Sequence, residues 1–168
     1  MADLPGVREA LRAGDAVVLD SGFSPFWSDF NLIHGLDSVA FFSATGDTLG
    51  LWGLNAPTPY MPVLAREAVM RETPLYRLEC GARCVYLAAV PLVEGGRNLG
   101  VEVLAMGLQD FIMDFRDVSG AELAFLESPT ASPCAITPAR DARLLSVSGG
   151  SLYQDLARRY VEQADGAP

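Results

Sequence analysis

The chain has 168 residues, half of them hydrophobic, and a net charge of −9 at pH 7 from 21 acidic and 12 basic residues. Every basic residue is Arg, which excludes a P-loop and lysine Schiff-base chemistry, and an acidic chain without basic clusters is not expected to bind nucleic acid. The length suits one domain with a proper core, and the sequence has neither a signal-peptide core nor an apolar run of about 18 residues, so we expect a cytosolic protein or a soluble piece of a longer chain.

The first third of the chain begins with a predicted helix over residues 4–23, because apolar residues recur there at helical spacing. Gly14 and Asp15 interrupt this pattern. Residues 24–35 are rich in aromatic side chains and contain Pro25. We expect this segment to be a connector that packs the opening helix onto a sheet or forms a dimer contact.

His34 ends the aromatic segment and is the only histidine in the chain. We expect it to be a capping or surface residue. A zinc site would have to combine it with three scattered cysteines that form no C-x-x-C pair, so we expect no metal and no cofactor. A hydrolase built from Ser28 and His34 is excluded, because the sequence has no G-x-S-x-G elbow.

The following segments predict an α+β fold, with a central antiparallel sheet flanked by helices. Residues 36–53 predict a hairpin in which Gly46 supplies a positive φ. A helix over residues 60–73 ends before Pro74. The remaining predicted elements, in chain order, are strands at 75–80 and 84–90, a third strand after the Gly-Gly turn at 95–96, a helix at 106–120, a strand at 121–127, a loop with Pro129, Pro133 and Pro138, a short apolar run at 142–150 and a helix at 151–163.

Cys80 and Cys84 flank three residues between two predicted strands. Residues that face each other across such a hairpin have Cβ atoms about 4.5–5.5 Å apart, close to the roughly 3.5–4.5 Å of a disulfide. We therefore predict a Cys80–Cys84 disulfide, in a register that places Leu78 opposite Tyr86. Two reduced cysteines, a redox switch and a metal remain alternatives, and Cys134 is expected to be a free thiol.

Several segments carry a family resemblance: "ALRAGD", "LDSVAFFSATGDTLGLWG", "LECGARCVYLAAVPL" and "GGRNLGVEVLAMGLQDFIMDFRDVSGAELAFL". Together they make the stretch from about Val7 to Leu126 resemble the membrane-distal module of bacterial double-Cache sensor domains. The later stretch "ARLLSVSGGSLYQDLARR" is similar to the passage into a second module. Such domains are the extracytoplasmic ligand-binding parts of membrane-anchored diguanylate cyclases, c-di-GMP phosphodiesterases and histidine kinases.

The resemblance implies a PAS-like Cache fold, in which a ligand lies between the sheet and the loop and helix after the first hairpin. It implies that Trp52 and Tyr60 wall an apolar pocket, with Tyr86 nearby, and that Arg66 or Arg77 holds a ligand carboxylate. Amino-acid-binding Cache domains carry a set of Tyr, Arg, Trp, Tyr and Asp whose spacing this chain does not follow. The resemblance therefore does not identify the ligand.

Each of these residues also has a plainer interpretation. Trp52 and Tyr86 suit the core, and Arg66 suits a solvated helix face. Arg77 shares its expected face with Glu79, which favours a local ion pair between them.

The sequence thus predicts a non-enzymatic, periplasmic sensor domain of an inner-membrane receptor, attached only through flanking transmembrane helices. A small-molecule ligand would shift helix packing to regulate a cytoplasmic output domain, for which we expect c-di-GMP turnover, and the N-terminal helix would form a homodimer. The expected parts are residues 1–30 (helix and aromatic connector), 31–128 (PAS-like Cache module) and 129–168 (proline-rich loop and C-terminal helix, leading to a membrane-proximal part). The alternatives are a cytosolic GAF-like regulatory domain and a thiol-dependent enzyme using Cys84 or Cys134.

Overall fold

The structure is a computed structural model that describes residue 4 and residues 6–80, 84–127 and 143–165. The chain forms two compact units, Met1–Gly107 and Leu108–Pro168, and each is described by itself. The elements follow the predicted order along the chain. The predicted division at residues 30 and 128 stays a prediction, and Cys134 and the three tail prolines lie outside the described residues.

Unit 1 begins with two helices, α1 (Val7–Ala13) and α2 (Ala16–His34). They are separated at the predicted interruption, where Gly14 has φ 65° and the Asp15 carboxylate accepts hydrogen bonds from the first turn of α2. The aromatic segment is not a separate connector, because residues 24–34 belong to α2, with Pro25 inside the helix, but its expected packing onto the sheet is confirmed. Packing explains the difference, since three aromatic side chains at helical spacing rest on the sheet and offset the hydrogen bond that proline removes. These are Phe23, Trp27 and Phe30.

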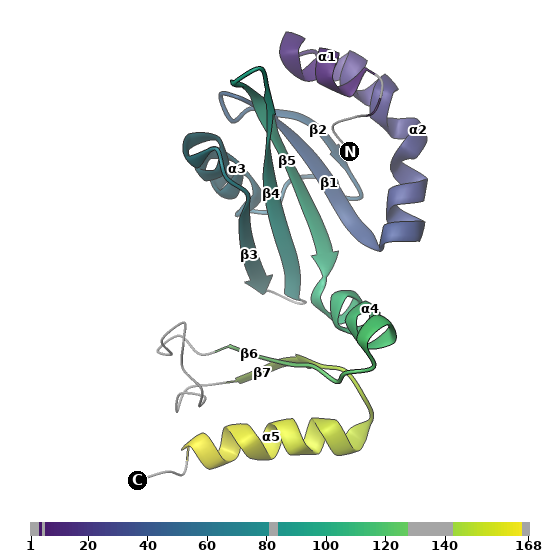
Figure 1. The fold of residues 1–168 in the computed structure, drawn as a ribbon, viewed down its shortest axis with the longest axis vertical. Helices are drawn as coiled ribbons and strands as arrows, with labels where there is room; N and C mark the ends of the chain where they lie inside the picture. The colour runs from purple at the N-terminus through teal and green to yellow at the C-terminus, as the bar shows by residue number, and fades with distance from the viewer. Residues whose placement is uncertain (1–3, 5, 81–83, 128–142, 166–168) are drawn as a thin grey trace. The chain divides into compact units, whose positions relative to one another are not determined.

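The centre of unit 1 is a five-stranded sheet in the order β2-β1-β5-β4-β3, with every neighbouring pair antiparallel. This is the predicted α+β architecture, with helices on both sides of the sheet (Figure 1). The strands are β1 (Leu36–Ser43), β2 (Thr48–Trp52), β3 (Leu75–Cys80), β4 (Cys84–Glu94) and β5 (Arg97–Gly107). The turn between β1 and β2 uses Gly46 at φ 87°, as predicted.

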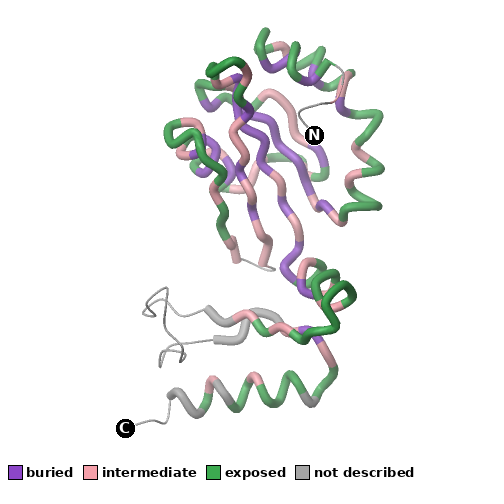
Figure 2. The backbone as a smooth tube through the Cα atoms, viewed as in Figure 1, coloured by how far each residue is buried: buried purple, intermediate pink, exposed green. Residues whose placement is uncertain are grey.

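The two faces of this sheet bury separate apolar clusters, and the strands at its centre are the most buried (Figure 2). On the α2 face, the buried residues of the cluster are Val7, Ala10, Leu11, Leu19, Phe23, Leu36, Val39, Phe41, Trp52, Leu92 and Leu99. On the α3 face, which helix α3 (Met61–Arg71) covers, they are Ala40, Phe42, Met61, Leu64, Ala65, Ala68, Leu87, Ala89, Val101, Val103 and Ala105. The alternation of side chains along β1 and β5 supplies both clusters.

The pairing of β3 with β4 has the predicted register. Cys80 lies opposite Cys84, and Leu78 lies opposite Tyr86. The period of two along each strand then fixes which residues share a face, so Arg77 and its partner Leu87 both lie on the α3 face.

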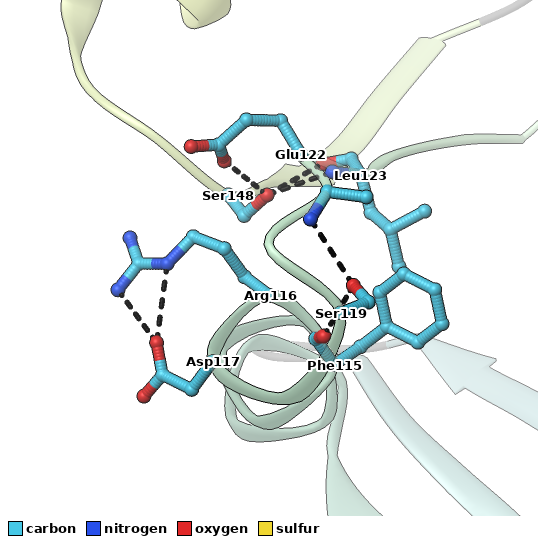
Figure 3. Close-up of polar contacts among 8 residues, drawn as sticks. Phe115, Arg116, Asp117, Ser119, Glu122, Leu123 and Ser148 are labelled. Carbon is cyan, nitrogen blue, oxygen red and sulfur yellow. Dashed lines mark hydrogen bonds and ion pairs between the residues drawn. The ribbon is translucent and has the colours of Figure 1, made fainter.

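Unit 2 contains α4 (Leu108–Ser119), β6 (Ala124–Glu127), β7 (Arg143–Val147) and α5 (Ser151–Asp165), with β6 and β7 paired antiparallel. Ser148, which is fully buried, joins the start of β6 to the end of β7 (Figure 3). Its hydroxyl donates to Glu122 Oε2 at 2.6 Å and accepts from the Leu123 amide at 2.7 Å. A two-stranded sheet is marginal alone, so these bonds are expected to matter for its stability.

Within the described part of the chain, no helix is both long enough and apolar enough to cross a membrane.

Candidate functional site

Two of the five predicted site residues, Tyr60 and Arg77, meet at the edge of the α3 face. Arg77 extends from the edge strand β3, and Tyr60 is the N-cap residue directly before α3. The Arg77 Cζ atom lies 3.9 Å from the centroid of the Tyr60 ring, which is a cation–π contact. Both side chains are exposed to solvent. A cation–π contact with the ring uses none of the guanidinium N–H groups as hydrogen-bond donors to a carboxylate, so these donors stay available.

The predicted ion pair between Arg77 and Glu79 is not formed among the described residues. Glu79 instead accepts a hydrogen bond from the Thr58 hydroxyl at 2.5 Å. The register explains this, because Glu79 is opposite Val85 on the α3 face, within reach of the segment that precedes α3. Two contacts therefore tie that segment to β3: Thr58 to Glu79, and Tyr60 to Arg77.

The sequence analysis missed Thr58, although a signal was available. It stands between Pro57 and Pro59 just before a helix, and threonine is a frequent residue at such positions because its hydroxyl forms local hydrogen bonds. In the structure this hydroxyl donates a hydrogen bond to Glu79 in β3, and α3 has no side-chain cap.

Ser38 is a further polar residue on the α3 face that the sequence analysis did not select. It lies in β1 opposite Ala105, and its side chain is fully buried. Its Oγ atom has no hydrogen-bond partner within the described residues. The period-two pattern of β1 contains the signal, because Ser38 alternates with Ala40 and Phe42, both in the α3-face cluster.

Trp52 lies on the other side of the sheet from Tyr60. Its ring packs in the α2-face cluster, 4.5 Å from the ring of Phe23 and 5.8 Å from that of Phe41 between centroids. Its indole N–H donates to Ser24 Oγ at 2.8 Å. Trp52 therefore fills the core, as its plainer interpretation expected, and does not wall the same pocket as Tyr60.

Tyr86 and Arg66 also lie apart from the Tyr60–Arg77 contact. Tyr86 points to the α2 face, where its ring stacks on that of Tyr76 at 6.0 Å, and burial raises the pKa of its hydroxyl. Arg66 is exposed on α3, and its side chain lies against the β1–β2 turn, since a Cβ on Gly46 would come within 2.8 Å of Arg66 Cγ. The ligand-binding role of all five residues stays a prediction.

The structure joins Cys80 and Cys84 in a disulfide at the end of the β3–β4 hairpin, with an S–S distance of 2.09 Å. The three residues between them, including Arg83, lie outside the described residues. The bridge lies at the end of the strand that carries Arg77 and Glu79, so it holds that strand against β4. A cysteine in a disulfide is not a thiol nucleophile, which removes Cys84 from that role in this state.

One buried carboxylate lies on the α2 face, in the central strand β5. Glu102 is opposite Phe41 and Val90 and is only 4% exposed. Its Oε1 atom lacks a hydrogen-bond partner within the described residues. Burial raises the pKa of Glu102 to about 7, because the charged form loses its hydration.

Comparison with known protein families gives a match over residues 1–165. The family is dCache_3, described as the double sensory domain of two-component sensor kinase. No curated protein matches the chain.

Solved structures of sensor and ligand-binding domains align with the chain. The sensor domain of the histidine kinase DctB from V. cholerae aligns at 12% identity with a TM-score of 0.52, over 93% of this chain and 63% of that one. The ligand-binding domain of the amino acid chemoreceptor PctC from Pseudomonas aeruginosa PAO1, in complex with GABA, aligns at 19% identity with a TM-score of 0.46, over 72% of this chain and 61% of that one.

The ligand-binding domain of the chemoreceptor CtaA from Pseudomonas fluorescens, in complex with L-serine, aligns at 17% identity with a TM-score of 0.49, over 74% of this chain and 56% of that one. The chain thus spans between 56% and 63% of the length of these three domains. At 12% identity the likeness to the DctB sensor domain concerns the fold alone.

Proposed function

The chain belongs to the dCache_3 family of sensory domains of two-component sensor kinases, and from this premise we propose that its α3 face binds a small carboxylate at Arg77. The observation that carries the proposal is the state of Arg77 in a strongly acidic chain. The chain has 21 acidic residues, yet the contact that Arg77 makes within the described residues is with the Tyr60 ring. A guanidinium with unused donors beside an aromatic ring is suited to bidentate binding of a carboxylate.

Membership of a sensory family argues against the two alternative functions that the sequence analysis left open. Domains of this family sense and do not catalyse, as the sequence analysis expected, so a thiol-dependent enzyme is no longer considered. The GAF-like alternative is replaced by membership of the dCache_3 family.

The proposed mechanism is a shift between two arrangements of the segment that precedes α3. A ligand carboxylate competes with the Tyr60 ring for Arg77 and so weakens one of the two contacts that tie this segment to β3. The arrangement that binds the carboxylate better then becomes more populated, by the difference in affinity between the two. α3 packs on the same sheet as α2, so the sheet is the proposed route by which this change reaches the N-terminal helices.

The parent protein is proposed to be a membrane receptor whose sensory part lies outside the cytoplasm. The family description favours a histidine kinase as its output domain over the c-di-GMP enzymes that we expected from the sequence. A homodimer through the N-terminal helices is also proposed. Its support is the exposed apolar residues of α2, among which Val17, Leu32 and Ile33 are each more than 70% exposed.

A thermal-shift screen of small carboxylates on matched arginine variants tests the carboxylate site. We expect at least one acid to raise the unfolding temperature of the wild type, and Arg77→Gln to remove that shift. Arg66→Gln is the control, because it removes the same charge from the same side of the sheet, at an exposed residue that lies against the β1–β2 turn. Equal loss of the shift in both variants would indicate a general charge effect and would contradict the proposed site.

A further inference from the structure

Ser38 is an unusual residue for the middle of an apolar cluster. Its side chain is fully buried, and its hydroxyl has no partner within the described residues. Buried hydroxyl groups nearly always form hydrogen bonds, because burying one without a partner is unfavourable. An unpaired hydroxyl in the core of a sensory domain therefore calls for a partner that comes from outside the chain, such as a ligand or a water molecule.

The sheet register places Ser38 and Arg77 in one row across the α3 face. Ser38 is opposite Ala105, Ala105 is opposite Leu87, and Leu87 is opposite Arg77. Neighbouring strands are about 4.8 Å apart, so the two ends of the row are separated by about 14 Å between Cα atoms, part of which the arginine side chain can span. The row is polar at both ends and apolar between them, with a small Ala105 next to Ser38.

Helix α3 covers the α3-face cluster, and the segment between β2 and α3 that the proposed mechanism moves leads into this helix, with Leu54 packed against the same cluster. The segment leaves β2 at Gly53, where φ is 84° and a Cβ atom would come within 2.1 Å of the Asp37 carbonyl oxygen, directly before Ser38. Its other end is held to β3 by the Thr58–Glu79 and Tyr60–Arg77 contacts. Displacing the segment from Arg77 would therefore begin to open the row toward Ser38.

We propose that the Ser38 hydroxyl is the inner contact of the bound ligand and selects a carboxylate that carries a neutral hydroxyl or carbonyl group. This rests on the proposed function, in which Arg77 holds the carboxylate. The inner group is expected to be neutral, because the cluster residues beside Ser38 on this face, among them Ala40 and Ala105, are apolar and burying a second charge against them would be unfavourable. A hydroxyl or carbonyl group would satisfy Ser38 Oγ without that cost.

The test uses the full chain and pairs of acids that differ only in a terminal hydroxyl. The pairs are glycolate and acetate, 3-hydroxypropionate and propionate, 4-hydroxybutyrate and butyrate, and 5-hydroxyvalerate and valerate. Their dissociation constants are measured by calorimetry on the wild type, Ser38→Ala, Ser38→Cys, Arg77→Gln and the exposed control Ser21→Ala. The cysteine variant keeps the volume of the side chain and weakens its hydrogen bond, which provides a second variant if the alanine variant changes the packing.

For at least one pair, we expect the wild type and Ser21→Ala to bind the hydroxylated acid about tenfold more tightly than its partner. Both Ser38 variants should bind the two acids of that pair equally, and Arg77→Gln should bind neither acid. If the wild type binds both members of every pair equally and still needs Arg77, the role of Ser38 is overturned and the proposed function stands. If no acid binds the wild type, both proposals are overturned.

Discussion

The two faces of the unit 1 sheet differ in their packing and in how their polar groups are satisfied. On the α2 face, large rings pack against one another, and the one indole N–H at their centre is satisfied by Ser24. On the α3 face, alanines and medium-sized side chains fill the core, and polar groups at Ser38 and Arg77 are left without hydrogen-bond or ion-pair partners in the described chain. We propose that the α3 face keeps these polar groups available for binding, whereas the α2 face contributes mainly to stability.

The largest effect should come from the aromatic core of the α2 face. Phe23 is fully buried and its ring contacts those of Phe30, Phe41 and Trp52. Replacing it with Ala should lower the free energy of unfolding of unit 1 by about 3–5 kcal/mol, because it leaves a cavity in a packed core. Both tryptophans lie in unit 1, so their fluorescence during urea unfolding reports this change.

Phe26 provides the matched control in the same helix, because it is 36% exposed. Phe26→Ala should cost roughly 1 kcal/mol or less. Equal costs for the two variants would show that α2 does not provide the core that we assign to it.

Glu102 is the exception on the α2 face, and it should make the stability of unit 1 depend on pH. Its pKa is raised to about 7 in the folded protein, so the folded state holds a proton that the unfolded state has released. The stabilisation that this protonated carboxyl gives the folded state is therefore fully present below pH 4, and it is lost as the pH rises toward 7. Above pH 7 the buried charge should cost on the order of 3 kcal/mol relative to the neutral form.

Glu102→Gln keeps the shape and removes the titration. The variant should match the wild type near pH 4 and exceed it in unfolding free energy at pH 8. The measurement is urea unfolding at both pH values, and the difference between the two proteins separates Glu102 from the other titrating groups. A difference that does not change with pH would mean that Glu102 has the same pKa in the folded and unfolded states, and it would contradict the raised pKa.

The disulfide should have a smaller effect, confined to the edge of the α3 face. The bridge closes a loop with a sequence separation of 4, for which loop-closure entropy gives about 2 kcal/mol. Cys80→Ser with Cys84→Ser should lower the unfolding free energy by that amount and weaken carboxylate binding, because β3 carries Arg77 and Glu79. Reductant should reproduce the loss in the wild type and have no effect on the double variant.

If mass spectrometry shows two freed thiols in the reduced wild type and the unfolding midpoint is unchanged, this role of the bridge is contradicted.

Much of unit 1 could be predicted from the sequence because local signals and the fold agree there. The helix break at Gly14, the turn at Gly46 and the β3–β4 register follow from turn chemistry and from the period of two in the strands. Residues 24–34 of α2 were missed because Pro25 is a strong local signal against a helix, and only tertiary packing of the neighbouring aromatic side chains overrides it.

The candidate site was harder to predict because its members are distant in sequence. Tyr60 and Arg77 were both selected, but their contact depends on how the segment before α3 lies against β3. Trp52 was selected for its residue type, and the face of β2 that carries it is decided by a register shift between Phe41 and Phe42 that no local pattern reveals. The Thr58–Glu79 bond likewise joins residues 21 positions apart.

Hydrogen exchange on the full chain, with and without the hydroxylated acid that binds most tightly, tests the binding role of the α3 face most directly. We predict that exchange slows in β3 and changes in residues 53–61, with a smaller change in α2, since the ligand contacts Arg77 and Ser38 and displaces the segment before α3. Slower exchange in α2, with residues 53–61 and β3 unaffected, would contradict the account and would assign binding to the opposite face of the sheet.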